Sequence, residues 1–336
     1  MAADRVQRTK IIDGLATPAF IHNGGYHFIN LPVFADGLVD CWGMLDLALF
    51  REKLRTGWVV PQVPDGETLS VHGLGSWTIS GGQWDLDAAG FLDRVTSLVR
   101  ELNPRMENLH DCHGRTEELI RGVRTEILGF ASEQTVRIVD PDAAFSKRVT
   151  GDHLSVIVRS TDYYIADLRI FKDGICELTR LPSPATLTLD DLQRAVSEGN
   201  LVGTIPAGAR VGLHGLGSFI VTEEHHCTDP AEMLREVADL FATLNRRPDS
   251  LARCRAAYAA YEADPCVALR GALREAYEAV PTHNRRYVGD MDTRDVAVRM
   301  IIYGDQELEG WSHRAAGRAL GLGTLPSIRV PKPRDE

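Results

Sequence analysis

The sequence predicts an α+β protein of two tandem duplicated modules, each roughly βββαββα with an antiparallel sheet, plus a small C-terminal α/β segment. The prediction starts from residues 71–77, Val-His-Gly-Leu-Gly-Ser-Trp, which return 142 residues later as Leu-His-Gly-Leu-Gly-Ser-Phe at residues 213–219. Holding that offset without gaps pairs residues 47–112 with 189–254, and 20 of the 66 paired positions are identical. The repeat therefore indicates an internal duplication rather than a chance motif.

Each copy opens with three predicted strands. In the first copy these are residues 19–21, 28–34 and 38–42, separated by Asn23-Gly24-Gly25 and Ala35-Asp36-Gly37. Glycine accepts the positive φ that tight hairpin turns demand, so both triplets predict turns. The second copy repeats the second turn at Asp173-Gly174 after a shift of five residues, which places an insertion near residues 179–186.

Two helices follow in each copy. Leu47, Phe50 and Leu54 are spaced i, i+3, i+7 and make one apolar stripe, which Leu189, Leu192 and Val196 repeat. Gly57 and Gly199 stand where a left-handed residue ends a helix. A strand pair around the Gly-Leu-Gly bend comes next, and Asp87 and Asp229 then suit the N-caps of the second helices.

The rest of the chain is less regular. Residues 113–129 and 255–281 are expected to be helical, residues 135–139 a strand, residues 296–303 a strand and residues 305–320 a helix. The predicted division is an N-terminal arm (1–18), module 1 (19–130), a connecting segment (131–155), module 2 with extra helices (156–281) and a C-terminal segment with an extended tail (282–336).

Composition excludes several classes of protein. With 37 Lys and Arg against 47 Asp and Glu, the net charge is −10, which does not favour binding to nucleic acid. Arg246, Arg247, Arg253 and Arg255 form a local basic group that is expected to be a solvated face. No apolar run suits a signal peptide or a membrane span, and the six cysteines include no Cys-x-x-Cys pair, so a soluble cytoplasmic protein with reduced thiols is expected.

His72 and His214 are the predicted catalytic pair. A pseudo-two-fold relation between the copies could bring both imidazoles to one cleft, where they would bind a metal or act as acid and base. The alternative is that each histidine only helps to shape its Gly-Leu-Gly bend. The sequence favours this structural alternative without deciding between the two.

His110, His113 and Glu117 form the densest set of metal-ligand types. His113 and Glu117 would share a helix face at i, i+4, and both are legitimate zinc ligands. The second copy keeps only the cysteine of this stretch, Cys254 for Cys112, which favours a small core residue over a ligand. The cofactor stays unknown, with a divalent metal such as zinc as the candidate.

Two functions are expected from these features. The first is an intracellular binding or interaction protein, of the immunity, inhibitor or adaptor kind, whose modules present a composite acidic surface to a protein partner or hold a small-molecule ligand. The alternative is a metal-assisted or acid/base hydrolytic enzyme with its site between the modules. The sequence does not identify the ligand, the partner or the oligomeric state.

Overall fold

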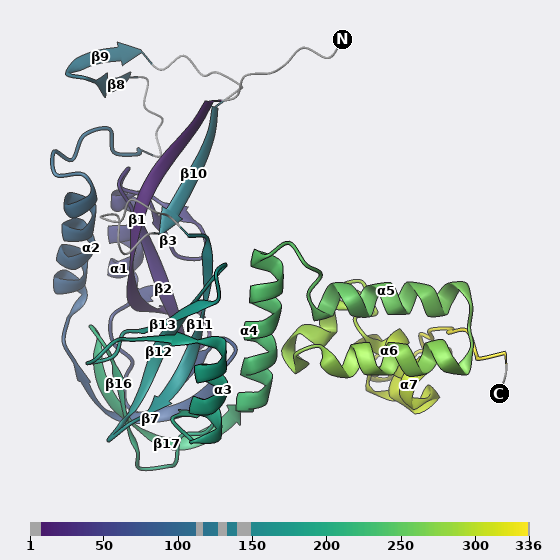
Figure 1. Cartoon of the computed structure of the whole chain (residues 1–336). Helices are drawn as coiled ribbons and strands as arrows, with labels where there is room; N and C mark the ends of the chain where they lie inside the picture. The colour runs from purple at the N-terminus through teal and green to yellow at the C-terminus, as the bar shows by residue number, and fades with distance from the viewer. Residues whose placement is uncertain (1–7, 112–116, 127–132, 140–148, 335–336) are drawn as a thin grey trace, which may run out of the picture.

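The protein is a mixed α+β structure, as the sequence predicts, and its main sheet is curled. A computed structural model of the chain describes residues 8–111, 117–126, 133–139 and 149–334. Helices flank the sheet on both sides, and a group of further helices projects away from it beyond α4 (Figure 1).

The first module follows the predicted order with one short strand added on each side of its first helix. Its elements are β1 (Arg8–His22), β2 (Tyr26–Phe34), β3 (Val39–Asp40), β4 (Met44–Leu45), α1 (Leu47–Arg55), β5 (Val59–Val60), β6 (Thr68–Val71), β7 (Gly75–Trp84) and α2 (Ala88–Leu102). Strand β1 begins at Arg8, so part of the predicted N-terminal arm belongs to the sheet.

The second module repeats this order element by element. Its elements are β11 (Gly151–Arg159), β12 (Tyr163–Phe171), β13 (Ile175–Thr179), β14 (Ala185–Thr188), α3 (Leu189–Ser197), β15 (Leu201–Val202), β16 (Arg210–Leu213), β17 (Gly217–Cys227) and α4 (Pro230–Leu244). The duplication is therefore visible in the fold as well as in the sequence.

The helix ends confirm the predicted caps. The Asp87 carboxylate accepts a hydrogen bond from the backbone N–H of Gly90, and Asp229 accepts one from Ala231, each at 2.8 Å. These bonds satisfy donors that the first helical turn leaves free. The same chemistry therefore starts α2 and α4.

Both modules share one sheet, which corrects the expectation of two antiparallel sheets. Strands β7 and β17 pair antiparallel at the centre, with Ile79 opposite Val221, and join the two halves of the order β1-β2-β6-β7-β17-β16-β12-β11. Within each half one pair is parallel, β2 with β6 and β12 with β16. The pairs are parallel because a helix carries the chain across the sheet before the next strand begins.

The core has two main parts. The largest cluster of buried side chains combines module 1 residues with Ile165, Val211, Phe219 and Val221 of module 2. A second cluster lies within module 2, where Leu168 and Ile170 of β12 pack with Leu192 of α3 and Val237 of α4. Alternate residues of β12 thus face different clusters, as the two-residue period of a strand requires.

The segment between the modules is a correction. In place of the expected helix over 113–129, the described residues form a hairpin of β8 (Glu117–Ile120) and β9 (Val123–Glu126). Its turn has positive φ at Arg121 and Gly122, which suits a two-residue hairpin. The predicted strand at 135–139 is confirmed as β10 (Glu133–Val139), parallel to the start of β1.

The C-terminal elements form a helical unit, here meaning residues 250–319. They are α5 (Ser250–Ala263), α6 (Val267–Ala279), the 3₁₀ helix η1 (Thr282–Tyr287), α7 (Val296–Tyr303), the 3₁₀ helix η2 (Asp305–Gly310) and α8 (Ser312–Ala319). The strand expected at 296–303 is wrong, because this segment is a helix. Helices α5 and α6 are helical as predicted, but they pack with α7 in a buried cluster of their own rather than with module 2.

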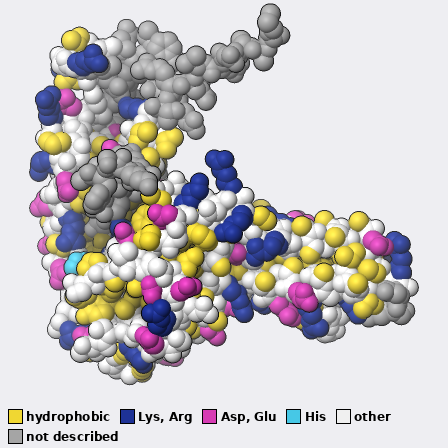
Figure 2. Space-filling view, in the orientation of Figure 1, with side chains coloured by type: hydrophobic (Ala, Val, Ile, Leu, Met, Phe, Trp, Pro, Cys, Tyr) yellow, Lys and Arg dark blue, Asp and Glu magenta, His cyan; other side chains and the backbone are white. Residues whose placement is uncertain are grey.

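The arginines of the predicted basic group lie where α4 gives way to α5. Figure 2 shows Lys and Arg side chains gathered near this junction. Arg246 and Arg247 are exposed, and the Arg247 guanidinium lies 5.4 Å from the Phe241 ring centroid.

Among the described residues, no helix is both long and apolar enough to cross a membrane.

Candidate functional site

The repeated His-Gly-Leu-Gly-Ser segment forms a tight turn in each module. The N–H of Leu74 donates to the Val71 carbonyl at 3.1 Å, and Leu216 donates to Leu213 at 2.9 Å. The first glycine of each turn has positive φ, +75° at Gly73 and +82° at Gly215, which strongly favours glycine. Both leucines are buried.

The second glycine of each turn permits close strand pairing. A Cβ on Gly75 would lie 2.2 Å from the His226 carbonyl oxygen, and one on Gly217 would lie 2.0 Å from that of Gln83. These contacts cross the β7–β17 junction. The fold therefore explains the repeated glycines and leucines, whereas both histidines are exposed.

The two histidines lie apart. Because β7 and β17 are antiparallel, Gly75 stands opposite Cys227 at one end of the pair and Gly217 opposite Trp84 at the other. The turns that carry His72 and His214 therefore lie at opposite ends, and the expectation that both imidazoles meet in one cleft is wrong.

The helices that lie under these turns carry opposite charges at the equivalent positions that contact the turns. Arg94 of α2 donates a hydrogen bond to the Gly215 carbonyl in the other module. Glu236 of α4 is the counterpart of Arg94, and its Oε2 lies 3.7 Å from the position of a Cβ on Gly73. A carboxylate cannot donate to the Gly73 carbonyl as the guanidinium does. The Gly215 turn thus accepts a hydrogen bond from a guanidinium, whereas the Gly73 turn lies beside a carboxylate.

Glu236 instead contacts the helical unit. Its Oε1 lies 3.5 Å from Nε2 of His283, and the backbone N–H of Thr282 donates to Oε2 of Glu232 at 2.8 Å. The imidazole rings of His72 and His283 approach edge to face, with centroids 6.1 Å apart. The His72 turn, α4 and η1 therefore converge.

Beside this convergence is a cleft of about 750 Å³, here called the His72 cleft. The sheet side contributes His72, His226 and Thr228, and the helical unit contributes Tyr277, Thr282, Tyr303 and the charged and imidazole groups of His283, Arg285, Arg286, Asp295 and Arg299. Three arginines and three histidines line it against one carboxylate. That carboxylate, Asp295, accepts a hydrogen bond from the Tyr277 hydroxyl at 2.5 Å.

The cleft's electrostatics follow from these neighbours. Hydrogen bonding to Glu236 raises the pKa of His283 above its ordinary value of 6.5, although burial opposes the shift. Burial, followed by the hydrogen bond to Asp295, raises the pKa of Tyr277, so this phenol stays neutral. Arg299 pairs with Glu307, whereas Arg285 and Arg286 form no ion pair with any described carboxylate.

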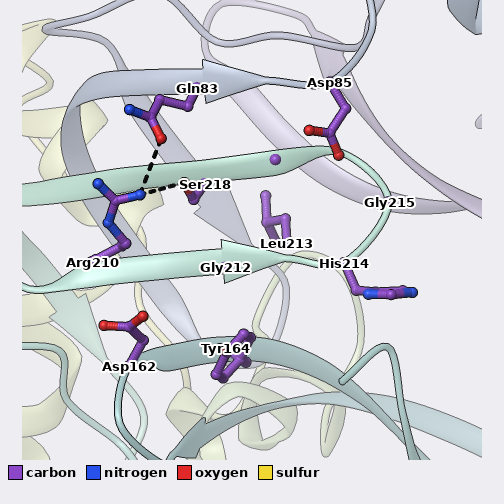
Figure 3. A pocket seen from close by; sticks show the side chains of 11 residues that line it. Gln83, Asp85, Asp162, Tyr164, Arg210, Gly212, Leu213, His214, Gly215 and Ser218 are labelled. Atoms are coloured by element: carbon purple, nitrogen blue, oxygen red, sulfur yellow. Dashed lines mark hydrogen bonds between the residues drawn. The ribbon is translucent and has the colours of Figure 1, made fainter. Parts of the chain in front are cut away.

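His214 lines a different, smaller hollow of about 390 Å³, shown in Figure 3. At one end Arg210 donates hydrogen bonds to Gln83 Oε1 at 3.1 Å and to Ser218 Oγ at 3.3 Å, while His214 lies at the other end (Figure 3). Asp85 and Asp162 add two carboxylates. The helical unit contributes no lining residue here, so the two turns open into unlike surroundings.

The predicted metal set is only partly described. His110 is exposed, and its backbone N–H donates to the Asp36 carbonyl at 2.5 Å. His113 lies outside the described residues, and Glu117 begins strand β8 where a helix was predicted. Within the described ranges, no group of three or more His, Cys, Asp or Glu side chains is placed to hold a metal ion.

Comparison with protein families divides the chain between residues 248 and 249, where the second module meets the helical unit. Residues 3–106 and 140–248 match the family described as "Domain of unknown function (DUF7638)". The chain belongs to the DUF7638 family. Residues 249–319 match a second family, "Domain of unknown function (DUF7639)". No curated protein and no solved structure matches the chain.

The DUF7638 match covers both modules, and the DUF7639 match covers the helical unit from just before α5 to the end of α8. The His72 cleft is lined from both regions. Residues of both family regions are therefore needed to line it.

Sequence reasoning identified His72 but missed the rest of the cleft. His283, Arg285 and Arg286 belong to a segment without periodicity or motif, and only the fold brings them to the His72 turn. One signal was available, the charge reversal from Arg94 to Glu236 within an alignment that otherwise preserves the apolar positions.

Proposed function

We propose that this protein is a binding protein whose His72 cleft holds a small anionic ligand. The observation that supports it is the charge of the cleft lining, three arginines against one carboxylate, with Arg285 and Arg286 in no ion pair with a described carboxylate. The chain as a whole carries a charge of −10. A local field opposite in sign to the net charge favours a small anion over an acidic macromolecular surface.

The arginine donors are held in place before a ligand arrives. Arg285 donates to the carbonyls of Val280 at 3.0 Å and Glu278 at 3.1 Å, and its guanidinium lies 5.1 Å from the Tyr277 ring centroid. Arg286 donates to the Tyr287 hydroxyl at 2.7 Å. A guanidinium has five N–H donors, so both retain donors for a phosphate or carboxylate group.

This proposal keeps the predicted class of binding protein and changes its expected ligand. The composite acidic surface for a protein partner stays a prediction, because no contact in the structure bears on it. The cleft instead supports the small-molecule alternative, with phosphate or carboxylate as the recognised group.

Calorimetric titration with inorganic phosphate and pyrophosphate tests the proposal. Arg286→Ala is expected to weaken pyrophosphate binding roughly tenfold, since a hydrogen bond to a charged group contributes about 1.5–3 kcal/mol. Arg100→Ala is the matched control, because Arg100 is exposed on α2 and does not line the cleft. Absence of binding to either anion at millimolar concentration, or equal losses in the two variants, would overturn the proposal.

The second candidate is acid/base catalysis at the same place. It is favoured by one observation, the His283–Glu236 pair beside the second imidazole of His72. A carboxylate that orients a histidine is a recurrent arrangement of general bases. His72→Ala and His283→Ala would then abolish hydrolysis of p-nitrophenyl phosphate while pyrophosphate still binds. Elemental analysis of the purified protein for zinc and manganese tests the metal-assisted form.

A further inference from the structure

Trp42 is an exposed aromatic residue in an unfavourable backbone conformation. Its side chain is 58% exposed, and its φ is +62°. A bulky residue rarely adopts left-handed φ, and such strain persists where the surrounding structure imposes it, commonly at binding sites. Burial does not explain this conformation, because most of the indole is in solvent.

Neighbouring rings fix the position of the indole. The Trp58 ring packs edge to face against Trp42 with centroids 6.1 Å apart, and the His27 ring lies 5.4 Å away at 49°. Lys53 in turn lies 4.6 Å from the Trp58 ring centroid. An exposed indole held in this way is a preformed surface on which a planar group can stack.

The indole lines a hollow of about 380 Å³, here called the Trp42 hollow. Phe28 and Pro32 contribute apolar surface, while the polar lining groups include Asp40, His153, Ser155 and Glu236. His72 and Gly73 line both this hollow and the His72 cleft. The aromatic surface and the arginine cluster are therefore neighbours across one turn.

The second module lacks this aromatic pair. Under the alignment of the two copies, Thr179 stands in the position of Trp42 and Asn200 in that of Trp58. The indole thus occurs only beside the turn that adjoins the helical unit. An indole found in one module only and the arginine cluster of the helical unit therefore meet at His72.

We propose that the ligand is a nucleotide, with its phosphate bound in the His72 cleft and its base stacked on Trp42 in the Trp42 hollow. This inference rests on the proposed function and adds the base. A nucleobase combines a planar face for the indole with polar edges that Asp40 and Ser155 can meet, and its phosphate suits the arginines. An inorganic anion alone would leave the indole without a role.

Titration of the full chain with four probes tests this inference: adenosine 5′-monophosphate, adenosine, ribose 5-phosphate and pyrophosphate. Adenosine monophosphate is expected to bind at least tenfold more tightly than ribose 5-phosphate, because stacking on an aromatic side chain contributes to each base bound. It is also expected to quench tryptophan fluorescence.

Two variants separate the two halves of the site. Trp42→Ala is expected to weaken adenosine monophosphate binding about tenfold and leave ribose 5-phosphate binding unchanged. Arg286→Ala is expected to weaken both by the same factor. Met44→Ala is the matched control, because Met44 is 46% exposed two residues away and does not line the hollow.

The outcomes distinguish the two proposals. Equal affinities for adenosine monophosphate and ribose 5-phosphate, or an unchanged ratio in Trp42→Ala, would overturn the nucleotide inference and leave anion binding intact. Adenosine binding as tightly as its monophosphate would also overturn it. Failure of all three anions to bind would overturn the proposed function itself.

Discussion

Asn30 and Asp167 occupy equivalent positions in the two modules and contact each other. The Asn30 amide Nδ2 donates to Asp167 Oδ1 at 3.2 Å. Ile79 and Val221 are also equivalent positions, and they face each other across β7 and β17. The pseudo-two-fold axis therefore passes through both pairs. Two aspartates at the first pair would repel, whereas the Asn30 amide opposite Asp167 supplies a hydrogen-bond donor.

Replacing Asp167 with Asn is expected to destabilise the protein by about 3 kcal/mol, the usual cost of breaking a buried charge pair. Asp167 is 5% exposed, and Arg169 Nε lies 3.4 Å from its Oδ2. Burial lowers the pKa of Arg180 to about 10, and the nearby Asp167 charge opposes that shift. Urea denaturation measures the loss. Exposed Asp93→Asn is the control, and a similarly small change in both variants would contradict the prediction.

The glycines of the repeated turn are predicted to be essential to the shared sheet. Gly217→Ala would force a Cβ to within 2.0 Å of the Gln83 carbonyl oxygen, a backbone atom that can move only with β7. We expect a loss of about 2–4 kcal/mol in free energy of unfolding, from crowding together with the positive φ of Gly217. Gly43→Ala, with no atom within 4 Å, should stay within about 0.5 kcal/mol of wild type. Equal stability of the two variants would show that β7 and β17 can move apart to accept the added methyl group, and would contradict the prediction.

The duplicated modules were predictable because local chemistry specifies them. Asp-Gly turns, aspartate caps and apolar stripes each act within a few residues, and each recurs in the second copy. Val296–Tyr303 was misread because an apolar run of eight residues has no period that separates a buried strand from a buried helix. In α7, Val298 and Ile301 pack in the cluster with α5 and α6, while Val296 and Met300 pack in a second cluster with Leu308 and Trp311.

The site could be predicted only in part. His72 stood out as a repeated residue that turns and cores do not need, yet nothing local indicated which of the two histidines would gain a partner. That depends on Glu236 facing His283 across more than forty residues of chain. Pairing of β7 with β17 in antiparallel register likewise decides that His72 and His214 separate, and no local pattern encodes it.

The buried thiols are predicted to react slowly in the native protein. Burial is the main cause that raises the pKa of Cys41, Cys176 and Cys254, each to about 11. Since the thiolate is the reactive form, modification at pH 8 should be about 100-fold slower than for an unperturbed cysteine. Pulsed iodoacetamide labelling followed by mass spectrometry measures each site, with the urea-unfolded chain as control. Native rates equal to the unfolded rates would show that these residues open readily to solvent.

Docking of the helical unit is predicted to depend on pH through His283. Its pKa is raised chiefly by the hydrogen bond to Glu236; the charges of Glu236 and Glu232 also raise it, while burial and Arg286 lower it. A raised pKa means that the folded protein binds the proton more tightly than the unfolded chain. This contribution is full below the ordinary pKa of 6.5 and is lost as the pH rises through the raised pKa of His283. This contribution should not exceed about 1 kcal/mol for a partly exposed pair.

Urea unfolding at pH 5.5 and 8.5 measures the contribution of His283. Both Glu236→Gln and His283→Asn should reduce the difference in free energy of unfolding between the two pH values. His153→Asn, which alters an exposed imidazole, should leave that difference unchanged. A pH difference that persists in both His283 and Glu236 variants would assign it to other groups.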